Sequence, residues 1–513
     1  MRQIKLVSGF LTVGSWTLAS RVLGFMRDVM IAAALGTGPV AEAFIVAFSL
    51  PNLFRRFFAE GAFNMAFVPM FSKELDDPAR AKAFAEEAMS ALTTVLIVLT
   101  VVAMVTMPWL VLAMASGFAD DDRLSIAIQY GRICFPYIVF ISIAALLSGV
   151  LNSVGRFHAA AAAPIMLNVV FIAAIIIAGF VGWPIGDTLA WSVPIAGVAQ
   201  MVIVWVAAKR AGFALMPRMP RLTPQMKRLA IIAAPAALAG GVVQINLLVG
   251  RQVASFYEGA VGWLSYADRL YQLPLGVVGI AVGIVLLPDL SRRLKHDDTQ
   301  GARDAFNRAT EFSLALTIPA AVALCVIPLP LVSVLYERGA FGADDTANTA
   351  LAVAIYGLGL PAFVLHKTLQ PLFFAREDTR RPFYVALVSL VVNAAIALSL
   401  RPVIGFSSAA IGTTLSGWAT VGLLMWMARG LGPASQFDAR FYQRTWRIFL
   451  ASIAMGVALW FAWVLLGPLL ATAFVRYIAL IALIAVGLVS YFVFGRLFGA
   501  FSLTELKASF RRS

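Results

Sequence analysis

The sequence predicts an all-α integral membrane protein with fourteen transmembrane helices, and three observations support this prediction. The 513-residue chain is 61% hydrophobic and only 13% charged, whereas soluble domains are about 45–50% apolar and about 25% charged. The apolar residues form runs, such as 88–115 and 477–495, that are long enough to cross a bilayer core of about 30 Å. The runs lack the alternating pattern of barrel strands, which favours helices.

The predicted spans follow one another along the whole chain. They cover residues 8–34, 39–71, 88–115, 126–151, 159–181, 188–207, 229–256, 263–289, 311–335, 349–374, 383–400, 406–428, 447–467 and 475–495. The first two exceed the length that a bilayer requires, so we expect them to be bent, tilted or extended. Arg2 and Lys5 before an apolar stretch resemble a signal peptide, but Arg21 and Arg27 follow without a small-residue cleavage site. We therefore interpret this segment as a retained first helix.

Loop charges predict that both termini are cytoplasmic. With the N-terminus inside, most of the 40 basic residues fall on the cytoplasmic side, richest in 209–228, 292–308, 376–381 and 429–447. Such a bias is the usual orientation signal. The loops on the opposite side hold Arg123, Arg338, Arg401 and Arg476. The same bias, with loops lying against anionic lipid, explains most of the net charge of +14 without nucleic acid as a partner.

The chain contains an internal repeat with a separation of about 225 residues. The matching pairs are 69–75 with 288–294, 117–121 with 341–345, Tyr130-Gly131 and Pro136 with Tyr356-Gly357 and Pro361, and Asn168 with Asn393. A unit of six helices inserts twice in the same orientation, which predicts two parallel lobes with the substrate site between them. We predict an N-lobe (1–210), a C-lobe (211–430) and a C-terminal part (431–513). The last holds spans 13 and 14 and an interfacial tail with a capping box at Ser502 and Glu505.

The sequence predicts neither an enzyme nor a cofactor or metal site. Cys134 and Cys325 lie far apart in apolar segments, where cysteine usually acts as a small hydrophobe. The three histidines are scattered, and the chain has no zinc, Walker or dinucleotide motif.

Charged residues within the spans point to the function. The cations are Arg21, Arg27, Arg55, Arg56, Arg132, Arg251, Arg269 and Lys367, and the acids are Asp28, Glu42, Glu60 and Asp268. A charge at the bilayer centre costs at least about 2.5–3.5 kcal/mol, so such residues face a partner or a water-filled cavity. The excess of cations over acids predicts a positively charged cavity.

Some of these cations can be explained without a functional role, and others cannot. Arg132 and Arg251 are isolated and can snorkel to an interface, whereas Lys367 fits either explanation. Arg56 can pair with Glu60 one helical turn away, and Arg55 is turned about 100° from Arg56.

The remaining arginines, Arg21, Arg27, Arg55 and Arg269, come from spans 1, 2 and 8, which the repeat places at the lobe interface. Guanidinium groups bind phosphate in a forked geometry, so four of them in one cavity indicate a phosphate ligand. We expect Ser20, Asp28, Glu42, Arg56, Glu60, Asp268 and Lys367 to supply supporting charge or to line the cavity.

Three strings resemble the MurJ (MviN) family of lipid II flippases. They are Ser20-Arg-Val-Leu-Gly-Phe-Met-Arg-Asp28, Leu50-Pro-Asn-Leu-Phe-Arg-Arg-Phe-Phe-Ala-Glu-Gly-Ala-Phe63 with Ala66-Phe-Val-Pro69, and Tyr266-Ala-Asp-Arg-Leu270 with Pro274 and Gly276-Val-Val-Gly279. The second string is the most specific, and the similarity extends from about residue 8 to the last helix.

The resemblance implies a two-lobed transporter of the MOP exporter superfamily in the bacterial inner membrane. Such proteins move lipid II, the lipid-linked peptidoglycan precursor, by alternating access. The family's functional arginines fall on Arg21, Arg27, Arg55 and Arg269, and its acidic position in the second helix falls on Glu42, where aspartate is common. Arg132 and Arg251 lie outside the family pattern, and Gln272 stands where an acid can occur. Some members bind sodium, but this sequence offers no convincing acidic site for it.

Other functions fit the sequence less well. A flippase for another polyprenyl-pyrophosphate-linked glycan, such as an O-antigen unit, would need the same lobes and cations. A multidrug exporter of the superfamily would have an acidic cavity suited to cationic drugs. A membrane glycosyltransferase would need a large hydrophilic loop with paired carboxylates, and the loops here are short. Partner proteins in cell-wall synthesis are compatible with the sequence but do not follow from it.

Overall fold

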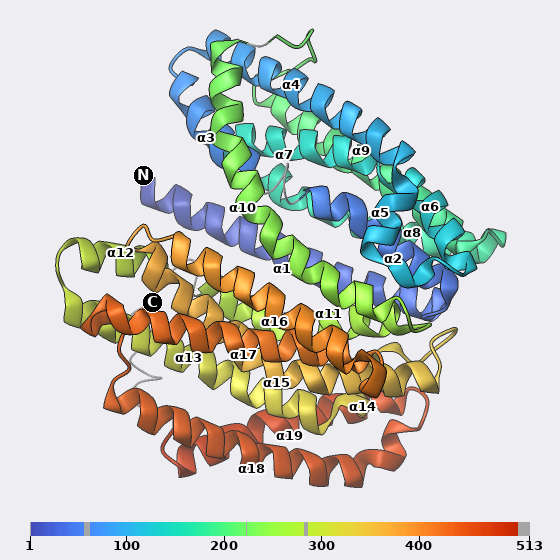
Figure 1. Ribbon diagram of the computed structural model, residues 1–513, viewed down its shortest axis with the longest axis vertical. Coiled ribbons are helices and arrows are strands. Elements are labelled where there is room, and N and C mark those ends of the chain that lie inside the picture. Colours follow the sequence, from blue (N-terminus) through green and yellow to red (C-terminus); the bar gives the residue numbers. More distant parts are fainter. Residues whose placement is uncertain (1, 56–61, 222, 282–285, 501–513) are drawn as a thin grey trace. The chain divides into compact units, whose positions relative to one another are not determined.

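The computed structural model describes residues 2–55, 62–221, 223–281 and 286–500. Throughout these ranges the regular elements are helices, apart from one isolated bridge between Arg338 and Phe341 (Figure 1). Ten candidate spans among the described residues are long and apolar enough to cross a membrane. These ten coincide with predicted spans 3–6 and 9–14, which confirms an all-α membrane protein.

The other four predicted spans are helical in their described residues. They correspond to α1 (Arg2–Leu35), α2 (Pro39–Arg55) with α3 (Ala62–Glu74), α10 (Pro224–Ala254), and α11 (Ala260–Ala281). The arrangement is therefore consistent with fourteen spans. Every predicted cavity arginine lies on α1, α2 or α11, outside the ten most apolar segments.

Three predicted spans are each split into two helices at a proline. The pairs are α4 (Pro78–Val105) and α5 (Met107–Met114), α6 (Asp122–Cys134) and α7 (Tyr137–Ser153), and α13 (Thr299–Val326) and α14 (Pro328–Tyr336). Proline lacks the N–H needed inside a helix and disfavours helical geometry in the preceding residue. The α4–α5 and α13–α14 breaks occupy matching places in the repeat, so the two halves bend their third helix alike.

Two compact units divide the chain by its internal packing. The first contains Met1–Gly262 and Arg338–Phe341, and the second contains Trp263–Glu337 and Gly342–Ser513. The remaining helices are α8 (His158–Val181), α9 (Ile185–Arg210), α12 (Leu287–Lys295), α15 (Ala343–Phe374), α16 (Arg380–Ile404), α17 (Ser407–Ala428), α18 (Ala439–Leu470) and α19 (Val475–Leu497).

The predicted lobe boundaries at residues 210 and 430 follow the repeat. The two packing units instead divide near residue 262, so that α10 belongs to the first unit. Here α10, the first helix of the second repeat, packs against α3, α4 and α5 in the first unit. The lobe boundaries therefore stay a prediction. The predicted interfacial tail begins at Ser502 and lies outside the described residues.

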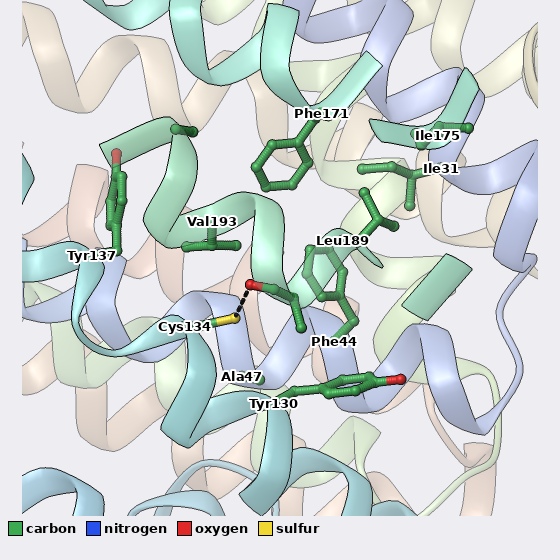
Figure 2. Packing of buried hydrophobic residues seen from close by; sticks show 12 residues of the cluster. Ile31, Phe44, Ala47, Tyr130, Cys134, Tyr137, Phe171, Ile175, Leu189 and Val193 are labelled. Carbon is green, nitrogen blue, oxygen red and sulfur yellow. Dashed lines mark hydrogen bonds between the residues drawn. The ribbon is translucent and has the colours of Figure 1, made fainter. Parts of the chain in front are cut away.

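An apolar core holds α1, α2, α6, α8 and α9 together in the first unit (Figure 2). The Phe44 ring lies 6.1 Å from that of Phe171 on α8, and both are buried. Cys134 is free and buried in this core, and its Sγ lies 3.6 Å from the Ala190 carbonyl oxygen. The interpretation of Cys134 as a small hydrophobe is thus confirmed.

Matching aspartates begin the fourth helix of each repeat. Asp121 accepts a hydrogen bond from the Arg123 backbone N–H at the start of α6, and the Arg123 side chain lowers the pKa of Asp121 by hydrogen bonding. Asp345, in the first turn of α15, accepts from the Gly342 N–H at 3.0 Å and from Trp263 Nε1 at 2.9 Å. Both aspartates thus accept backbone hydrogen bonds at the start of their helix, and Asp345 also binds Trp263 on α11.

Candidate functional site

Arg27 on α1, one of the four predicted cavity arginines, is buried in an ion pair. Its Nη2 lies 2.7 Å and its Nε 3.0 Å from Oδ1 of the adjacent Asp28. Both residues are less than a tenth exposed. The sequence predicted an excess of cations over acids within the spans, but Arg27 itself is paired with a carboxylate. The two residues are adjacent in the chain, and the long side chain of Arg27 folds back onto the Asp28 carboxylate.

An aromatic ring supports the guanidinium of Arg27 from a second helix. The Arg27 Cζ lies 5.5 Å from the centroid of the Phe171 ring on α8. Such contacts are attractive, because the ring face carries partial negative charge. Phe171 is itself fixed in the apolar core shown in Figure 2. The pair with Asp28 and the contact with Phe171 together hold Arg27 in one orientation.

Asn168 on α8 binds the backbone of α1 at Ser20, next to Arg21. Its Nδ2 donates to the Ser20 carbonyl oxygen at 3.0 Å, and the residue is 4% exposed. Gly24, one turn further along α1, lies against the same amide, where an added Cβ would sit 3.6 Å away. Arg21, which follows Ser20, is exposed. The sequence analysis identified Asn168 only as the repeat partner of Asn393. A polar asparagine at the same place in both apolar halves was the one sequence feature that could have indicated its role.

We expect Asn168→Ala to reduce the activity of the site several-fold while leaving membrane insertion unchanged. The variant loses one hydrogen bond, about 0.5–1.5 kcal/mol, and with it the anchor of α1 at Ser20. Activity in cells and the folded yield from membranes would be compared. Asn393→Ala, the matching change in the second unit, is the control, and an equal loss in both variants would refute a specific role for Asn168.

Glu42 lies in a closed cluster of charges at the start of α2. It is fully buried; Oε2 accepts from Arg123 Nη1 at 2.7 Å and Oε1 accepts from the Val261 backbone N–H at 2.9 Å. Arg123 also binds Asp121 at 2.6 Å and lies over the Phe118 ring. Glu42 is therefore paired with Arg123 and closed off from solvent, and its supporting role in the site stays a prediction.

The sequence did not identify Arg123 as a functional candidate. It was assigned to a loop, yet it is 6% exposed and belongs to the first turn of α6. Its partner Glu42 is 81 residues away in the chain. No local pattern could have revealed this pair.

The segment between α5 and α6 also holds the end of α10. Gln252 Oε1 accepts from the Ser116 N–H at 2.9 Å and from its hydroxyl at 2.7 Å. The Gly117 N–H donates to Ser255 Oγ at 3.0 Å. A Cβ at Gly117 would lie 2.4 Å from the Ser255 carbonyl carbon, so glycine is needed for this close approach. The end of α10 is therefore positioned by polar contacts within the first unit.

The other predicted residues of the first unit are only partly described. Arg55 ends α2 and is partly buried. The predicted pair of Arg56 and Glu60 falls in residues 56–61, outside the described ranges. Arg132 is exposed and donates to the Met104 carbonyl oxygen at 3.1 Å, and Arg251 is partly buried near the end of α10.

In the second unit, α11 presents Arg269 at an exposed position. Asp268 accepts a hydrogen bond from the side-chain amide of Gln272, one turn later. Gln272 stands where family members can have an acid, and here it binds the carboxylate of Asp268. Tyr266 and Tyr271 pack on Tyr336 and Tyr356, with ring centroids 5.3 and 5.0 Å apart, and anchor α11 to α14 and α15. Lys367 is exposed on α15.

No group of three or more histidine, cysteine, aspartate or glutamate side chains suited to a metal ion occurs among the described residues. The donor sets that are present, such as Glu42 with Asp121, are occupied by arginine.

Known proteins resemble this chain over most of its length. The family profile described as lipid II flippase MurJ matches residues 31–490. A probable lipid II flippase MurJ of Rhizobium meliloti (strain 1021) is 46% identical over 520 residues, which cover 99% of this chain and 97% of that protein. One of Rhizobium tropici is 49% identical over 422 residues, 81% of this chain and 79% of its own.

Solved structures show the same fold. The lipid II flippase MurJ in an inward closed conformation superposes with a TM-score of 0.78 at 23% identity, over 95% of this chain and 98% of that chain. An inward-facing MATE family transporter of the MOP superfamily gives a TM-score of 0.68 at 15% identity, over 82% and 96%. The fold is therefore shared by transporters with different cargoes.

Proposed function

Because this chain belongs to the MurJ family of lipid II flippases, we propose that it moves lipid II from the inner to the outer leaflet of the bacterial cytoplasmic membrane. The match over nearly the whole chain carries this proposal. The buried, oriented arginine of α1 supports it, because lipid II presents a pyrophosphate between its polyprenyl tail and its glycan. The protein acts as a transporter and not as an enzyme.

Arg21, Arg27, Arg55 and Arg269 form the proposed pyrophosphate site. Asp28 and Phe171 hold the guanidinium of Arg27 ready, so little side-chain freedom is lost when phosphate binds. The pair with Asp28 uses Nε and Nη2, and Nη1 can donate to a phosphate oxygen. Asp28, Asp268 and Lys367 adjust the charge around the site, and Ser20 lines it.

The proposed cycle is alternating access of two lobes with both termini in the cytoplasm. The headgroup enters from the cytoplasmic side, and the polyprenyl tail stays in lipid or against α18 and α19, whose outward faces carry exposed Trp460, Phe461 and Ile478. The sequence has no nucleotide-binding motif, so an ion gradient or the membrane potential drives the cycle. Moving one charge through 100 mV is worth about 2.3 kcal/mol.

Complementation tests the proposed substrate. Cells depleted of their own lipid II flippase would receive this chain, and the outward accessibility of labelled lipid II headgroups would be measured. We expect growth and headgroup exposure to return together. If the chain restored O-antigen export in a strain lacking that flippase, but not lipid II exposure, another polyprenyl-pyrophosphate glycan would be the cargo.

A further inference from the structure

The segment that joins the two repeats is held along the start of α4 in the first unit. This strap, defined as residues 213–221, has no regular secondary structure, so its backbone N–H groups need partners from elsewhere. Two of them find such partners on α4. The Arg218 N–H donates to Ser90 Oγ at 2.7 Å, and the Met216 N–H donates to Glu86 Oε1 at 3.4 Å. The backbone of the strap is therefore fixed to α4.

Apolar side chains at the start of the strap face inward. Phe213 and Leu215 are both buried. The Phe213 ring lies 5.6 Å from the Phe71 ring on α3, and the Leu215 carbonyl oxygen accepts a hydrogen bond from Trp205 Nε1 on α9 at 3.1 Å. Helices α3, α4 and α9 thus hold the strap in place, although residues 216–221 are exposed.

Glu86 is the buried charge against which the strap lies. Its residue is 2% exposed. Oε2 of Glu86 lies 2.7 Å from Nη2 of Arg218 on the strap, and Oε1 lies 3.9 Å from Lys82 Nζ on α4. The nearer cation therefore comes from the strap. A buried carboxylate is costly without a charged partner, so the strap and the buried charge stabilise each other.

The beginning of α10 is fixed by the same helices. Thr223, the N-cap of α10, accepts from the Met226 N–H at 3.3 Å and donates to Glu87 Oε2 at 3.0 Å. Gln225 donates to Glu74 on α3 at 3.2 Å. Beyond this point α10 packs against α3, α4 and α5 (Figure 1), and the polar contacts described above hold its end. Both ends of α10 are thus tied to the first unit, although the repeat counts α10 with the second half.

The second repeat has a buried glutamate at the matching position. Glu311 on α13 stands about 225 residues after Glu86 and is likewise buried. Arg308 donates to Glu311 and to Asp438, the N-cap of α18. In both halves a buried glutamate near the start of the third helix thus belongs to the ion pairs that hold the segment after the sixth helix. This indicates the same positioning task in both halves.

We propose that Glu86 is a positioning residue for transport: by holding the strap on α4, it makes α10 move with the first unit throughout the cycle. A strap that opened in each cycle would take the nearer cation away from a buried carboxylate every time, which is costly. Motion between the halves is therefore taken up beyond α10 and not in the segment that joins the repeats. This inference rests on the proposed alternating access.

Hydrogen exchange of the full chain in lipid nanodiscs tests the strap without any substrate. Glu86→Gln removes the charge that holds Arg218, so we expect the amides of residues 213–221 to exchange roughly tenfold faster. Arg218→Gln changes the same ion pair at a largely exposed side chain and should have the same effect. Glu311→Gln, the matching change in the second unit, is the control and should leave exchange in the strap unchanged. Equal acceleration by the two glutamate variants, or none by Glu86→Gln, would refute the role of Glu86.

A covalent tether tests whether the strap stays in place during transport. Ser90→Cys with Arg218→Cys joins two residues that are hydrogen-bonded in the structure. In a chain that also carries Cys134→Ala and Cys325→Ala, this pair would be oxidised in proteoliposomes, and lipid II headgroup accessibility would be followed with and without reductant. We expect the oxidised protein to flip lipid II faster than the reduced protein, because the tether replaces the lost pair with Glu86. Unchanged or slower flipping by the oxidised protein would overturn the proposal.

The two experiments separate this inference from the proposed cargo. Glu86→Gln should slow lipid II flipping several-fold, whereas normal flipping by this variant would exclude Glu86 as a positioning residue for transport. If the unmodified chain itself does not flip lipid II, the proposed cargo is wrong. Hydrogen exchange then still decides whether Glu86 holds the strap, because that measurement needs no lipid II.

Discussion

Arg27→Ala is expected to reduce lipid II flipping to the background of depleted cells while the protein still inserts into the membrane. Nη1 of Arg27, which the pair with Asp28 does not use, is proposed to donate charge-assisted hydrogen bonds to the pyrophosphate, each worth about 1.5–3 kcal/mol. Losing two of them weakens substrate binding by about 100-fold or more. Headgroup accessibility of labelled lipid II would be measured alongside the amount of folded protein in the membrane.

The ion pair with Asp28 adds a complication that a second variant resolves. Arg27→Ala leaves Asp28 buried without its guanidinium partner, which itself destabilises the fold. Arg27→Ala with Asp28→Asn removes both charges, so we expect it to restore the folded yield but not flipping. Arg132→Ala, at an exposed arginine of the spans, is the control and should transport normally. Normal flipping by Arg27→Ala would exclude Arg27 from the substrate site.

Arg123→Ala is expected to lower the free energy of unfolding by about 3–5 kcal/mol, the largest stability effect predicted here. The side chain of Glu42 is 0% exposed in its pair with Arg123, so removing the guanidinium leaves a buried carboxylate without its strongest partner. Asp121 and the Phe118 ring lose their contacts with the same group. Thermal unfolding in neutral detergent would measure the loss.

Two comparisons establish that the effect comes from burial. Glu42→Gln with Arg123→Gln removes both charges and should recover most of the lost stability. Arg80→Ala breaks an ion pair with Asp77 whose side chains are 77% and 51% exposed, and it should change stability by less than about 1 kcal/mol. An Arg123→Ala protein as stable as Arg80→Ala would contradict the assigned role of the Glu42 pair.

Much of the fold could be predicted because lipid imposes a simple rule on the chain. Within a bilayer every backbone polar group must be satisfied internally, so an apolar run such as 88–115 has to form helix. The repeat could also be read directly, since Asp121 and Asp345 begin matching helices. Arg27 could be singled out as a buried charge because a charge within an apolar helix is costly unless it has a partner or a water-filled cavity, and its role in transport stays a prediction.

The sequence by itself determined which segments are helices and how they repeat, and it predicted which charges lie at membrane depth. The tertiary structure alone decided what those charges contact: Glu42 with Arg123, Asn168 with the Ser20 carbonyl, and Arg308 with Asp438. Helix formation depends on neighbours within a few residues and on the solvent. These contacts join residues 81 to 148 positions apart, so they depend on helix packing, which no local pattern encodes.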